Sequence, residues 1–393
     1  MRRVIGPRRT TGEHEQTMRV AGLFAGVGGI ELGLGQAGLT TSLLCEIDPQ
    51  ARAVLENRFP GVPIEPDVSA ITRLPRGIDL LTAGFPCQDL SQAGRTSGIF
   101  GRRSGLIRSV FRLISCSRPP WVLIENVPFL LRLDGGRGIS YVVRTLERLG
   151  YRWAYRIVDT RAFGLPHRRE RVFLLASRDE DPASYLLAGD RPAIDADADG
   201  AVAHGFYWTE GTRGLGWAVD AVPTIKGGSA VGIPSPPAIW FSDGRFATPD
   251  IRDAERLQGF PVNWTRPAES VGRASYRWTL VGNAVSVPVA RWLGRSLMAP
   301  PAIEPKLQTT ELLEGAPWPR AAFGGPGAGR FAVDIGPFPV RRMRRHLHEF
   351  LEFDPTPLSR RAADGFRGRL QRSSLSRPAA FDDALNAYVG RAG

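Results

Sequence analysis

The chain has few cysteines, almost no lysine and no long apolar run, and each shortage excludes something. Three cysteines occur among 393 residues, Cys45, Cys87 and Cys116, and their spacing matches neither a disulfide framework nor a metal-binding pair. No run of about 18 apolar residues occurs, so nothing resembles a membrane-spanning helix or a signal peptide. We therefore expect a soluble cytoplasmic protein that needs no metal.

Charged residues are abundant, although lysine is scarce. Arginine and lysine together number 51 against 39 acidic residues, which gives a formal net charge of +12, and only Lys226 and Lys306 are lysine. This balance suits a polyanionic partner, because neutralised phosphates release counterions and supply most sequence-independent affinity. The richness in arginine, alanine, glycine and proline is also what a coding bias produces, so charge alone does not decide the partner.

Strand and helix patterns alternate to about residue 178 and predict an α/β fold with a doubly wound, mostly parallel sheet. Residues 1–17 are polar and basic and are predicted to form a disordered tail that precedes the fold. After residue 178 the pattern becomes irregular. The predicted division is 18–178 with 272–300 as the main domain, 179–271 as a smaller irregular domain, and 301–393 as a C-terminal helical extension.

Cys87 lies in the polar loop Gly84-Phe85-Pro86-Cys87-Gln88, directly after the apolar strand pattern of residues 78–83. Open α/β sheets bind ligands at the carboxyl ends of their strands. A reactive thiol needs partial exposure and an electropositive neighbourhood, and arginines follow this loop closely. A small buried hydrophobe is the alternative interpretation. Residues 92–103, which are rich in glycine and arginine, are predicted to form a mobile lid, with a plain surface loop as the alternative.

A glycine turn near the amino terminus indicates a nucleotide site. Gly26 and Gly28 follow a short strand and precede a helix, an arrangement that brings the backbone close to a ligand. Glu46 ends the next strand about 20 residues later, where a carboxylate can accept from ribose hydroxyls. Asp67 is placed to accept from an adenine amino group. Capping of the following helices is the alternative role for both acids.

Two further segments carry polar groups at strand ends. Glu125 and Asn126 end an apolar strand, and burial there would favour the protonated form of Glu125, which could then donate to a ring nitrogen. Asn126 could instead bond nearby backbone. Arg169 and Arg171 stand two residues apart at the start of another strand, so they share a face, while Arg168 points elsewhere.

These pieces resemble the DNA cytosine-5 methyltransferase family in order and spacing. The matching motifs are Phe-Ala-Gly-Val-Gly-Gly at 24–29, Pro-Cys-Gln at 86–88, Glu-Asn-Val at 125–127, the paired arginines, Arg-Leu-Gln-Gly-Phe-Pro at 256–261 and Gly-Asn-Ala-Val at 282–285. They span about three quarters of the chain. The resemblance implies a Rossmann-like S-adenosylmethionine-dependent domain and a target-recognition domain over 179–271.

The resemblance also implies roles for single residues. Cys87 would attack ring carbon 6 of a flipped cytosine, Glu125 would contact ring nitrogen 3 and the exocyclic amine, and Arg169 and Arg171 would hold the cytosine carbonyl and support the cysteine loop. S-adenosyl-L-methionine is the implied cofactor. Its binding site maps onto Phe24, Gly26, Gly28, Glu46, Ile47, Asp67, Val68, Leu106, Asn283 and Ala284.

One position departs from the family pattern. The paired-arginine motif usually begins with glutamine, and this chain has His167. We interpret the histidine as a packing or hydrogen-bonding replacement, with added pH sensitivity as a second interpretation.

Double-stranded DNA is the expected partner, and a monomer associated with the nucleoid is the expected state, with a cognate restriction endonuclease as a candidate partner. Candidates to touch DNA are Phe206, Tyr207, Trp208, Arg213, Trp217, Lys226 and the turn over 224–228. Packing or phosphate contact is the alternative for each of them. The extension is expected to hold two amphipathic helices, over 341–351 and 359–370, the second capped by Ser359.

Three other functions compete with DNA methylation. A transfer-RNA cytosine-5 methyltransferase would share the fold and the motifs. A non-catalytic DNA-binding module would not need Cys87, Glu125 and both arginines together. A nicotinamide-dependent oxidoreductase would leave Pro-Cys-Gln and Glu-Asn-Val unexplained.

Overall fold

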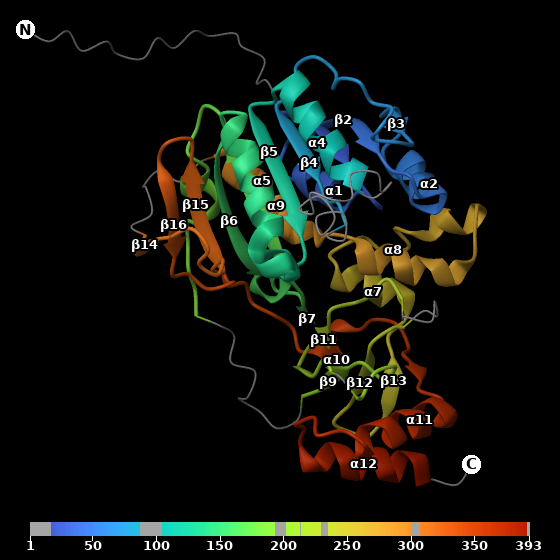
Figure 1. Ribbon diagram of the computed structural model, residues 1–393. Coiled ribbons are helices and arrows are strands. Elements are labelled where there is room, and N and C mark those ends of the chain that lie inside the picture. The colour runs from blue at the N-terminus through green and yellow to red at the C-terminus, as the bar shows by residue number, and fades with distance from the viewer. Residues whose placement is uncertain are drawn as a thin grey trace, which may run out of the picture.

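The computed structural model describes most of the chain in two lobes (Figure 1). The described residues are 17–86, 104–192, 202–212, 214–228, 235–299 and 307–390. Four of the features predicted from the sequence therefore fall outside them: the tail except for residue 17, Cys87, the lid over 92–103, and Arg213.

A sheet of ten strands forms the middle of the large lobe within the described residues. Its order is β14-β16-β15-β6-β8-β5-β4-β1-β2-β3, and the strands from β5 to β3 run parallel. The bounds are β1 Arg19–Leu23, β2 Thr40–Cys45, β3 Ile64–Glu65, β4 Leu80–Ala83, β5 Trp121–Asn126, β6 Arg152–Asp159, β8 Glu170–Ser177, β14 Thr309–Glu311, β15 Ala321–Gly325 and β16 Gly329–Val333.

Helices cover both faces of this sheet, which explains why its central strands are apolar. Every residue of β4 and of β5 is buried, as expected for parallel strands packed on two sides. The helices α4 (Ser104–Ser117) and α5 (Arg137–Arg148) pack on one face. The opposite face carries α1 (Gly29–Gly35), α6 (Pro182–Leu186) and α9 (Val287–Met298). The predicted doubly wound α/β fold is confirmed.

Short elements close the carboxyl edge of the sheet and lead to the small lobe. They are α2 Pro49–Arg58, η1 Pro128–Leu131, η2 Leu133–Gly136, η3 Thr160–Phe163, β7 His167–Arg168, β11 Val222–Pro223, α7 Ile251–Leu257, η4 Arg266–Ser270, η5 Ala274–Tyr276 and α8 Arg277–Asn283. After α8 the chain returns to the large lobe through α9, whose Ala290 packs so tightly on α1 that a Cβ on Gly33 would lie 2.5 Å from its own Cβ.

The small lobe is built around a five-stranded sheet within the described residues, in the order β10-β9-β12-β13-β17. Its strands are β9 His204–Phe206, β10 Ala218–Val219, β12 Ala238–Trp240, β13 Phe246–Thr248 and β17 Thr356–Pro357. Two helices from the chain's end, α11 (Arg360–Gln371) and α12 (Ala379–Gly390), pack below this sheet (Figure 1). The core between them is aromatic.

The C-terminal extension serves both lobes. Its strands β14, β15 and β16 lengthen the large sheet, since β15 pairs antiparallel with β6. Farther on, β17 pairs with β13 and completes the small sheet. The sequence pattern predicts a helical extension, and this prediction is incomplete because the extension also contains strands. Edge strands this short carry little periodicity, so the pattern does not reveal them.

The two predicted helices of the extension had different outcomes. The second is confirmed as α11, and its N-cap is correctly placed, since the Ser359 hydroxyl accepts from the backbone N–H of Ala362. The first is wrong for most of its length, because only α10 (Leu347–Phe350) is helical. Residues 341–346 have no regular secondary structure, and the N–H of Arg342 donates to the carbonyl of Ala162 in η3. The helix α12 was not predicted.

No helix in the described part of the chain is long and apolar enough to cross a membrane.

Candidate active site

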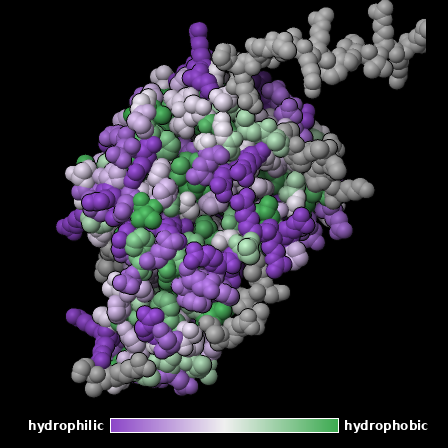
Figure 2. Space-filling model, turned by 180° about the vertical axis from the view of Figure 1, so that it is seen from behind, coloured by the Kyte–Doolittle hydropathy of each residue, from purple (hydrophilic) through white to green (hydrophobic). Residues whose placement is uncertain are grey.

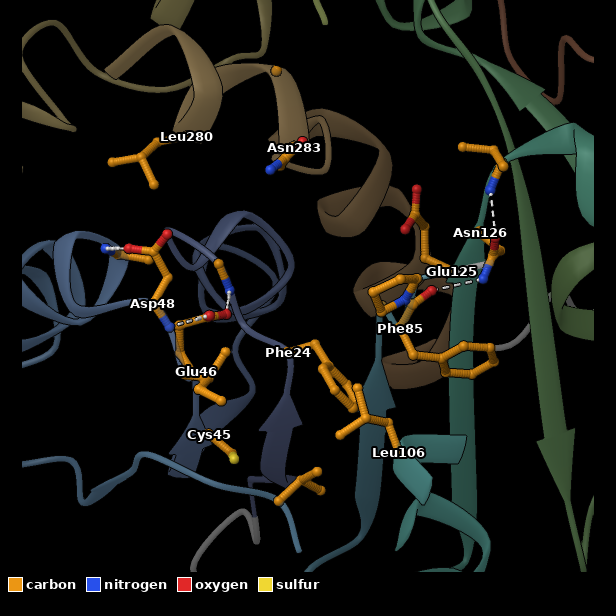
Figure 3. Close-up of a pocket in the computed structure, with 18 of the residues that line it drawn as sticks. Phe24, Cys45, Glu46, Asp48, Phe85, Leu106, Glu125, Asn126, Leu280 and Asn283 are labelled. Atoms are coloured by element: carbon orange, nitrogen blue, oxygen red, sulfur yellow. Dashed lines mark hydrogen bonds between the residues drawn. The ribbon is translucent and has the colours of Figure 1, made fainter. Parts of the chain in front are cut away.

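A cavity of about 560 Å³ opens at the carboxyl edge of the large sheet, where β1, β2, β4 and β5 end. This size suits a cofactor-sized ligand. Its lining includes Phe24, Gly26, Glu46, Ile47, Asp48, Pro66, Asp67, Val68, Gly84, Phe85, Pro86, Leu106, Glu125, Asn126, Arg169, Arg171, Leu280 and Asn283. Segments far apart in the sequence, residues 24–171 and residues 280–283, therefore meet at one site (Figure 3).

The glycine turn shapes one end of the cavity. Gly26 and Gly28 have φ of +56° and +79°, in the left-handed region that favours glycine. A Cβ on Gly28 would also lie 2.4 Å from the Phe59 ring. Gly26 lines the cavity and Gly28 does not, so Gly28 sets the backbone path against α2.

Glu46 is fixed by the backbone around it. Its Oε2 accepts from the N–H of Gly26 at 2.7 Å, and its Oε1 accepts from the N–H of Asp48 at 2.9 Å. Burial raises the pKa of this carboxyl, and the two backbone hydrogen bonds oppose the rise. Each oxygen keeps a lone pair for a further donor. Capping of α2 is not its role, because Asp48 accepts from the N–H groups of Gln50 and Ala51.

Asp67 and Ile47 lie on the open side of the cavity. The carboxylate of Asp67 accepts from the N–H and the hydroxyl of Ser69, at 2.8 and 2.7 Å, and these bonds lower its pKa. Asp67 thus caps its own turn, and no helix follows it directly within the described residues, while its position on the cavity lining leaves acceptance from an adenine amino group as a prediction. Ile47 is 70% exposed, which leaves a large apolar surface facing solvent beside a polar rim.

Glu125 forms the other end of the cavity with Arg171. The Nε of Arg171 lies 3.2 Å from Oε1 of Glu125, and both side chains are largely buried. Burial raises the pKa of Glu125, and Arg171 and Arg169 oppose that rise. In Figure 3 the carboxylate of Glu125 lies to the right of Asn283 and slightly lower. A buried carboxyl with a raised pKa, paired with an arginine, therefore faces the cavity.

Arg169 shares this end but has a different set of partners. Its guanidinium donates to the carbonyls of Ile225, Gly282 and Ala284, at 3.3, 3.1 and 2.6 Å. It is 2% exposed. These bonds join the start of β8 to the small lobe and to α8. Arg169 therefore positions the walls of the site, and Ala284, which does not line the cavity, contributes its carbonyl to that support.

Asn126 holds the strand end that leads to Cys87. Its Nδ2 donates to the carbonyl of Phe85 at 2.9 Å, and its Oδ1 accepts from the N–H of Val127. The structural interpretation of Asn126 is correct. Pro86 lines the cavity and directly precedes Cys87 in the chain, although Cys87 itself lies outside the described residues.

His167 lies behind the site and is fully buried. The N–H of Ile225 donates to its Nε2 at 3.1 Å, so Nδ1 carries the proton and donates to the carbonyl of Leu257 at 3.0 Å. Burial and the positive charge of Arg169 hold its pKa well below 6.5. The histidine is therefore a neutral hydrogen-bonding bridge between β7, the small lobe and α7.

The DNA-reading candidates in the small lobe are mostly packed. Phe206 is fully buried in the aromatic core, and the indole N–H of Trp208 donates to the carbonyl of Pro236. Lys226 pairs with Glu210 and lies over the Tyr207 ring, 3.7 Å from its centroid. The turn over 224–228 packs on α8, where Thr279 donates to the carbonyl of Gly227.

Sequence reasoning missed three residues that line the cavity near the glycine turn. Asp48, Leu280 and Pro66 line the cavity, and the hydroxyl of Tyr276 donates to Asp48. The Asp48-Pro49 pair is an N-cap signature that could have identified Asp48. Leu280 and Tyr276 carry no local signal, because only the return of α8 brings them to this edge.

Comparison with known proteins identifies the family. The model of the C-5 cytosine-specific DNA methylases matches residues 18–198. The type II methyltransferase M2.BsuMI of Bacillus subtilis is 50% identical over 90% of this chain and 94% of its own length. This chain belongs to the C-5 cytosine-specific DNA methylase family. It is thus a DNA (cytosine-5-)-methyltransferase, as the motifs predicted.

Other relatives agree with this assignment. The type II methyltransferase M.PspPI of a Psychrobacter species is 30% identical over 73% of this chain and 80% of its own length. Among solved structures, the Dnmt2 methyltransferase of S. pombe superposes with a TM-score of 0.52 at 17% identity, covering 72% of this chain and 98% of that one. At that identity the likeness supports the methyltransferase fold alone.

Proposed function

We propose that this protein transfers a methyl group from S-adenosylmethionine to carbon 5 of a cytosine in a short DNA sequence, through a covalent adduct with Cys87. The observation that carries the proposal is one cavity with two chemically distinct ends. Glu46 and Ile47 line one end, and Glu125 with Arg171 lines the other. A donor and an acceptor of a methyl group can therefore lie side by side.

The cofactor end fits an adenosine derivative. The two oxygens of Glu46 are oriented by backbone N–H groups and retain lone pairs for ribose hydroxyls. The exposed Ile47 offers an apolar surface for a flat base, and Phe24, Val68 and Leu106 extend that apolar lining. When bound, S-adenosylmethionine supplies an electrophilic methyl group. Asn283 and Leu280 would close the site from the α8 side.

The base end fits a cytosine taken out of the duplex. The Cys87 thiolate would form a bond to ring carbon 6 while Glu125 shares a proton with ring nitrogen 3, which makes carbon 5 nucleophilic. Carbon 5 then gains the methyl group and loses its proton to a base, and the Cys87–carbon 6 bond breaks to restore the ring. Arg171, which pairs with Glu125, would hold the cytosine carbonyl.

The remaining assignments follow from this function. We propose residues 18–178 with 272–300 as the catalytic domain and 179–271 as the target-recognition domain, with α6 packed on the large lobe. The relatives are type II methyltransferases, so a restriction endonuclease for the same site is the partner we propose. A monomer in the bacterial cytoplasm, associated with the nucleoid, completes the proposal.

The test is methylation-sensitive sequencing of DNA from a host that expresses this protein, beside a host that expresses Cys87→Ser. We expect 5-methylcytosine in one short sequence context, present only with the intact cysteine. Removing the nucleophile should abolish transfer without loss of folding. Protection from thermal unfolding by S-adenosylmethionine in both proteins is the control.

Two results would contradict the proposal. A mark in the transfer RNA of the same host, with none in its DNA, would move the activity to the RNA-acting branch of the family. Absence of any mark from folded protein that binds the cofactor would favour a non-catalytic DNA-binding module.

A further inference from the structure

An arginine-rich surface lies where the two lobes join, away from the cavity. Two of its arginines, Arg291 and Arg295, lie on α9, and two more, Arg341 and Arg342, lie on residues 334–346, which we call the strap. None of the four lines the cavity. Figure 2 shows the molecule from the side of α9, where strongly hydrophilic side chains cover much of the middle of the face.

Backbone contacts fix the strap against η3 and bring its arginines toward α9. The N–H of Arg342 donates to the carbonyl of Ala162 at 3.1 Å. Gly164, with φ +87°, lies so close that a Cβ there would be 2.7 Å from the carbonyl oxygen of Met343. The neighbouring Phe163 ring of η3 packs on Trp292 of α9 at 5.8 Å between centroids. The strap and α9 thus both contact the same short element, and Arg342 lies near enough to Arg291 to affect its pKa.

The four arginines differ from their neighbours in lacking acidic partners. Arg161 pairs with Asp159, and Arg344 pairs with the buried Asp220. In the described part of the chain, by contrast, no ion pair involves Arg291, Arg295, Arg341 or Arg342. Charge therefore accumulates on this surface without compensation from the residues that the structure describes.

Arg291 shows that this charge is not simply solvated. Its Nε is buried and has no hydrogen-bond partner within the described residues. Burial, followed by the charges of Arg342 and Arg295, lowers its pKa, and no carboxylate opposes the shift. The mutual repulsion of Arg291, Arg295 and Arg342 costs free energy, and an anion bound to the accessible side of these guanidinium groups would offset it.

Met343 narrows the class of anion. It is 96% exposed, although the residues on both sides are held in place, Arg342 by Ala162 and Arg344 by Asp220. The strap therefore presents an apolar side chain outward between arginines. A free inorganic anion has no use for such a group, whereas nucleic acid offers phosphates beside apolar sugar and base surfaces.

We propose that Arg291, Arg295, Arg341 and Arg342, with Met343, form a second DNA-binding surface that contacts the phosphodiester backbone outside the segment held over the cavity. This proposal rests on the proposed function, because it takes DNA as the substrate. It adds a role for the C-terminal extension, which supplies the strap.

The test compares Arg291→Gln/Arg342→Gln with Arg73→Gln/Arg76→Gln. The control arginines are exposed and lie before the amino end of β4, and replacing both of them removes the same charge. Fluorescence anisotropy would measure binding to mixed-sequence duplexes of about 12 and about 40 base pairs over a series of salt concentrations. Each lost phosphate contact lowers the slope of log K against log salt by about 0.9.

We expect the slope for the long duplex to become shallower by about 2 in the Arg291/Arg342 variant, with the short duplex and the control variant unaffected. An unchanged slope for the long duplex would overturn the proposal. So would equal losses in both double variants, because they would indicate net charge alone. Competition with polyglutamate gives a third result that would overturn it. If polyglutamate displaces the long duplex more strongly from the native protein than from the Arg291/Arg342 variant, the surface binds an acidic polypeptide.

Two controls separate this result from others. Failure of the unaltered protein to bind either duplex would contradict the proposed function, whereas binding with an unchanged slope contradicts only the second surface. If the double variant does not fold, as judged by circular dichroism, Arg341→Gln and Met343→Ser replace it, because both side chains are exposed. Each of these substitutions should weaken binding of the long duplex and leave binding of the short duplex unchanged.

Discussion

The two lobes of this methyltransferase bury different kinds of side chain. The large lobe encloses charged groups, among them Glu31, Glu125 and Arg169, each 9% exposed or less. The core of the small lobe is aromatic, with Phe206 and Phe381 in contact at 5.1 Å between ring centroids. The buried carboxyls with a raised pKa, Glu31 and Glu125, therefore lie in the large lobe, while the small lobe depends on apolar packing between distant parts of the chain.

Removal of residues 301–393 should have the largest effect. It takes β17 from the edge of the small sheet, α11 and α12 from its core, and β15 from the edge of β6. Loss of one buried phenylalanine costs about 3–5 kcal/mol, and a domain is stable by about 5–15 kcal/mol. We expect insoluble protein, or protein without a cooperative transition in near-ultraviolet circular dichroism.

A point substitution tests the same packing without removing chain. Phe381→Ala should destabilise by about 3–5 kcal/mol in chemical denaturation, because it leaves a cavity among Phe206, Phe246 and Phe366. Leu313→Ala, at a side chain that is 68% exposed, is the matched control, and its free energy of unfolding should change little.

Soluble, active protein lacking residues 301–393 would show that the small lobe does not need the extension.

Glu125→Gln should have the next largest effect and should act on turnover. The amide keeps the shape but cannot share a proton with a base, and it leaves Arg171 without its anionic partner. We expect kcat to fall at least about a hundredfold in a methyl-transfer assay, since general acid–base catalysis contributes about 10²–10⁴. Cofactor protection against thermal unfolding should persist.

Glu147→Gln is the control for that substitution. Glu147 also pairs with an arginine, Arg330, at 2.7 Å, but it lies on α5 away from the cavity. Its replacement should leave kcat unchanged. Equal loss of turnover in both variants would indicate damage to the fold and not to the chemistry.

Glu31→Gln should change how stability depends on pH. Glu31 is buried between α1 and the sheet, where it accepts from the hydroxyl of Thr82 at 3.1 Å, and burial raises its pKa to about 7. Because the folded-state pKa lies above the unfolded value, this group's stabilising contribution is present at low pH and is lost as pH rises through about 7. Between pH 5 and pH 8 the free energy of unfolding of the variant should therefore rise relative to that of the native protein, by about 2.5 kcal/mol.

Thermal unfolding across that pH range measures the effect. Glu56→Gln, at an exposed position on α2, is the control and should leave the profile of the native protein unchanged. A constant difference between Glu31→Gln and the native protein at every pH would show that Glu31 does not change its ionisation on folding.

His167→Gln should have the smallest effect. A glutamine amide can replace both hydrogen bonds of the neutral imidazole, to the N–H of Ile225 and to the carbonyl of Leu257. We expect kcat within a few-fold and the same pH profile of turnover, because the pKa of His167 lies well below 6.5. A hundredfold change in either direction would make His167 part of the chemistry.

Much of the large lobe and its cavity could be predicted from local patterns. The strands that end in Glu46 and in Glu125 are apolar runs followed by polar groups, and parallel strands place such ends at one edge. The fine division of labour could not be predicted. Two arginines two residues apart look alike in sequence, yet Arg171 pairs with Glu125 and Arg169 with three carbonyls.

The C-terminal extension was predicted least well, for a physical reason. Residues 341–346 have an amphipathic pattern, but their backbone groups and side chains find partners in η3 and at Asp220, and these contacts outweigh a weak helix propensity. The helix α12 has apolar residues without strong periodicity, and Phe381 and Leu385 are buried only because the aromatic core of the small lobe receives them.

The family, the doubly wound sheet and the chemical groups at its carboxyl edge are evident from the sequence, since they depend on short motifs and on the burial of successive strands. The pairs of residues that meet across long stretches of chain are evident only in the folded protein: Thr82 with Glu31, Tyr276 with Asp48, and Phe381 with Phe206. An apolar or polar residue does not specify its distant partner in a local pattern, because that partner is selected by how the whole chain packs.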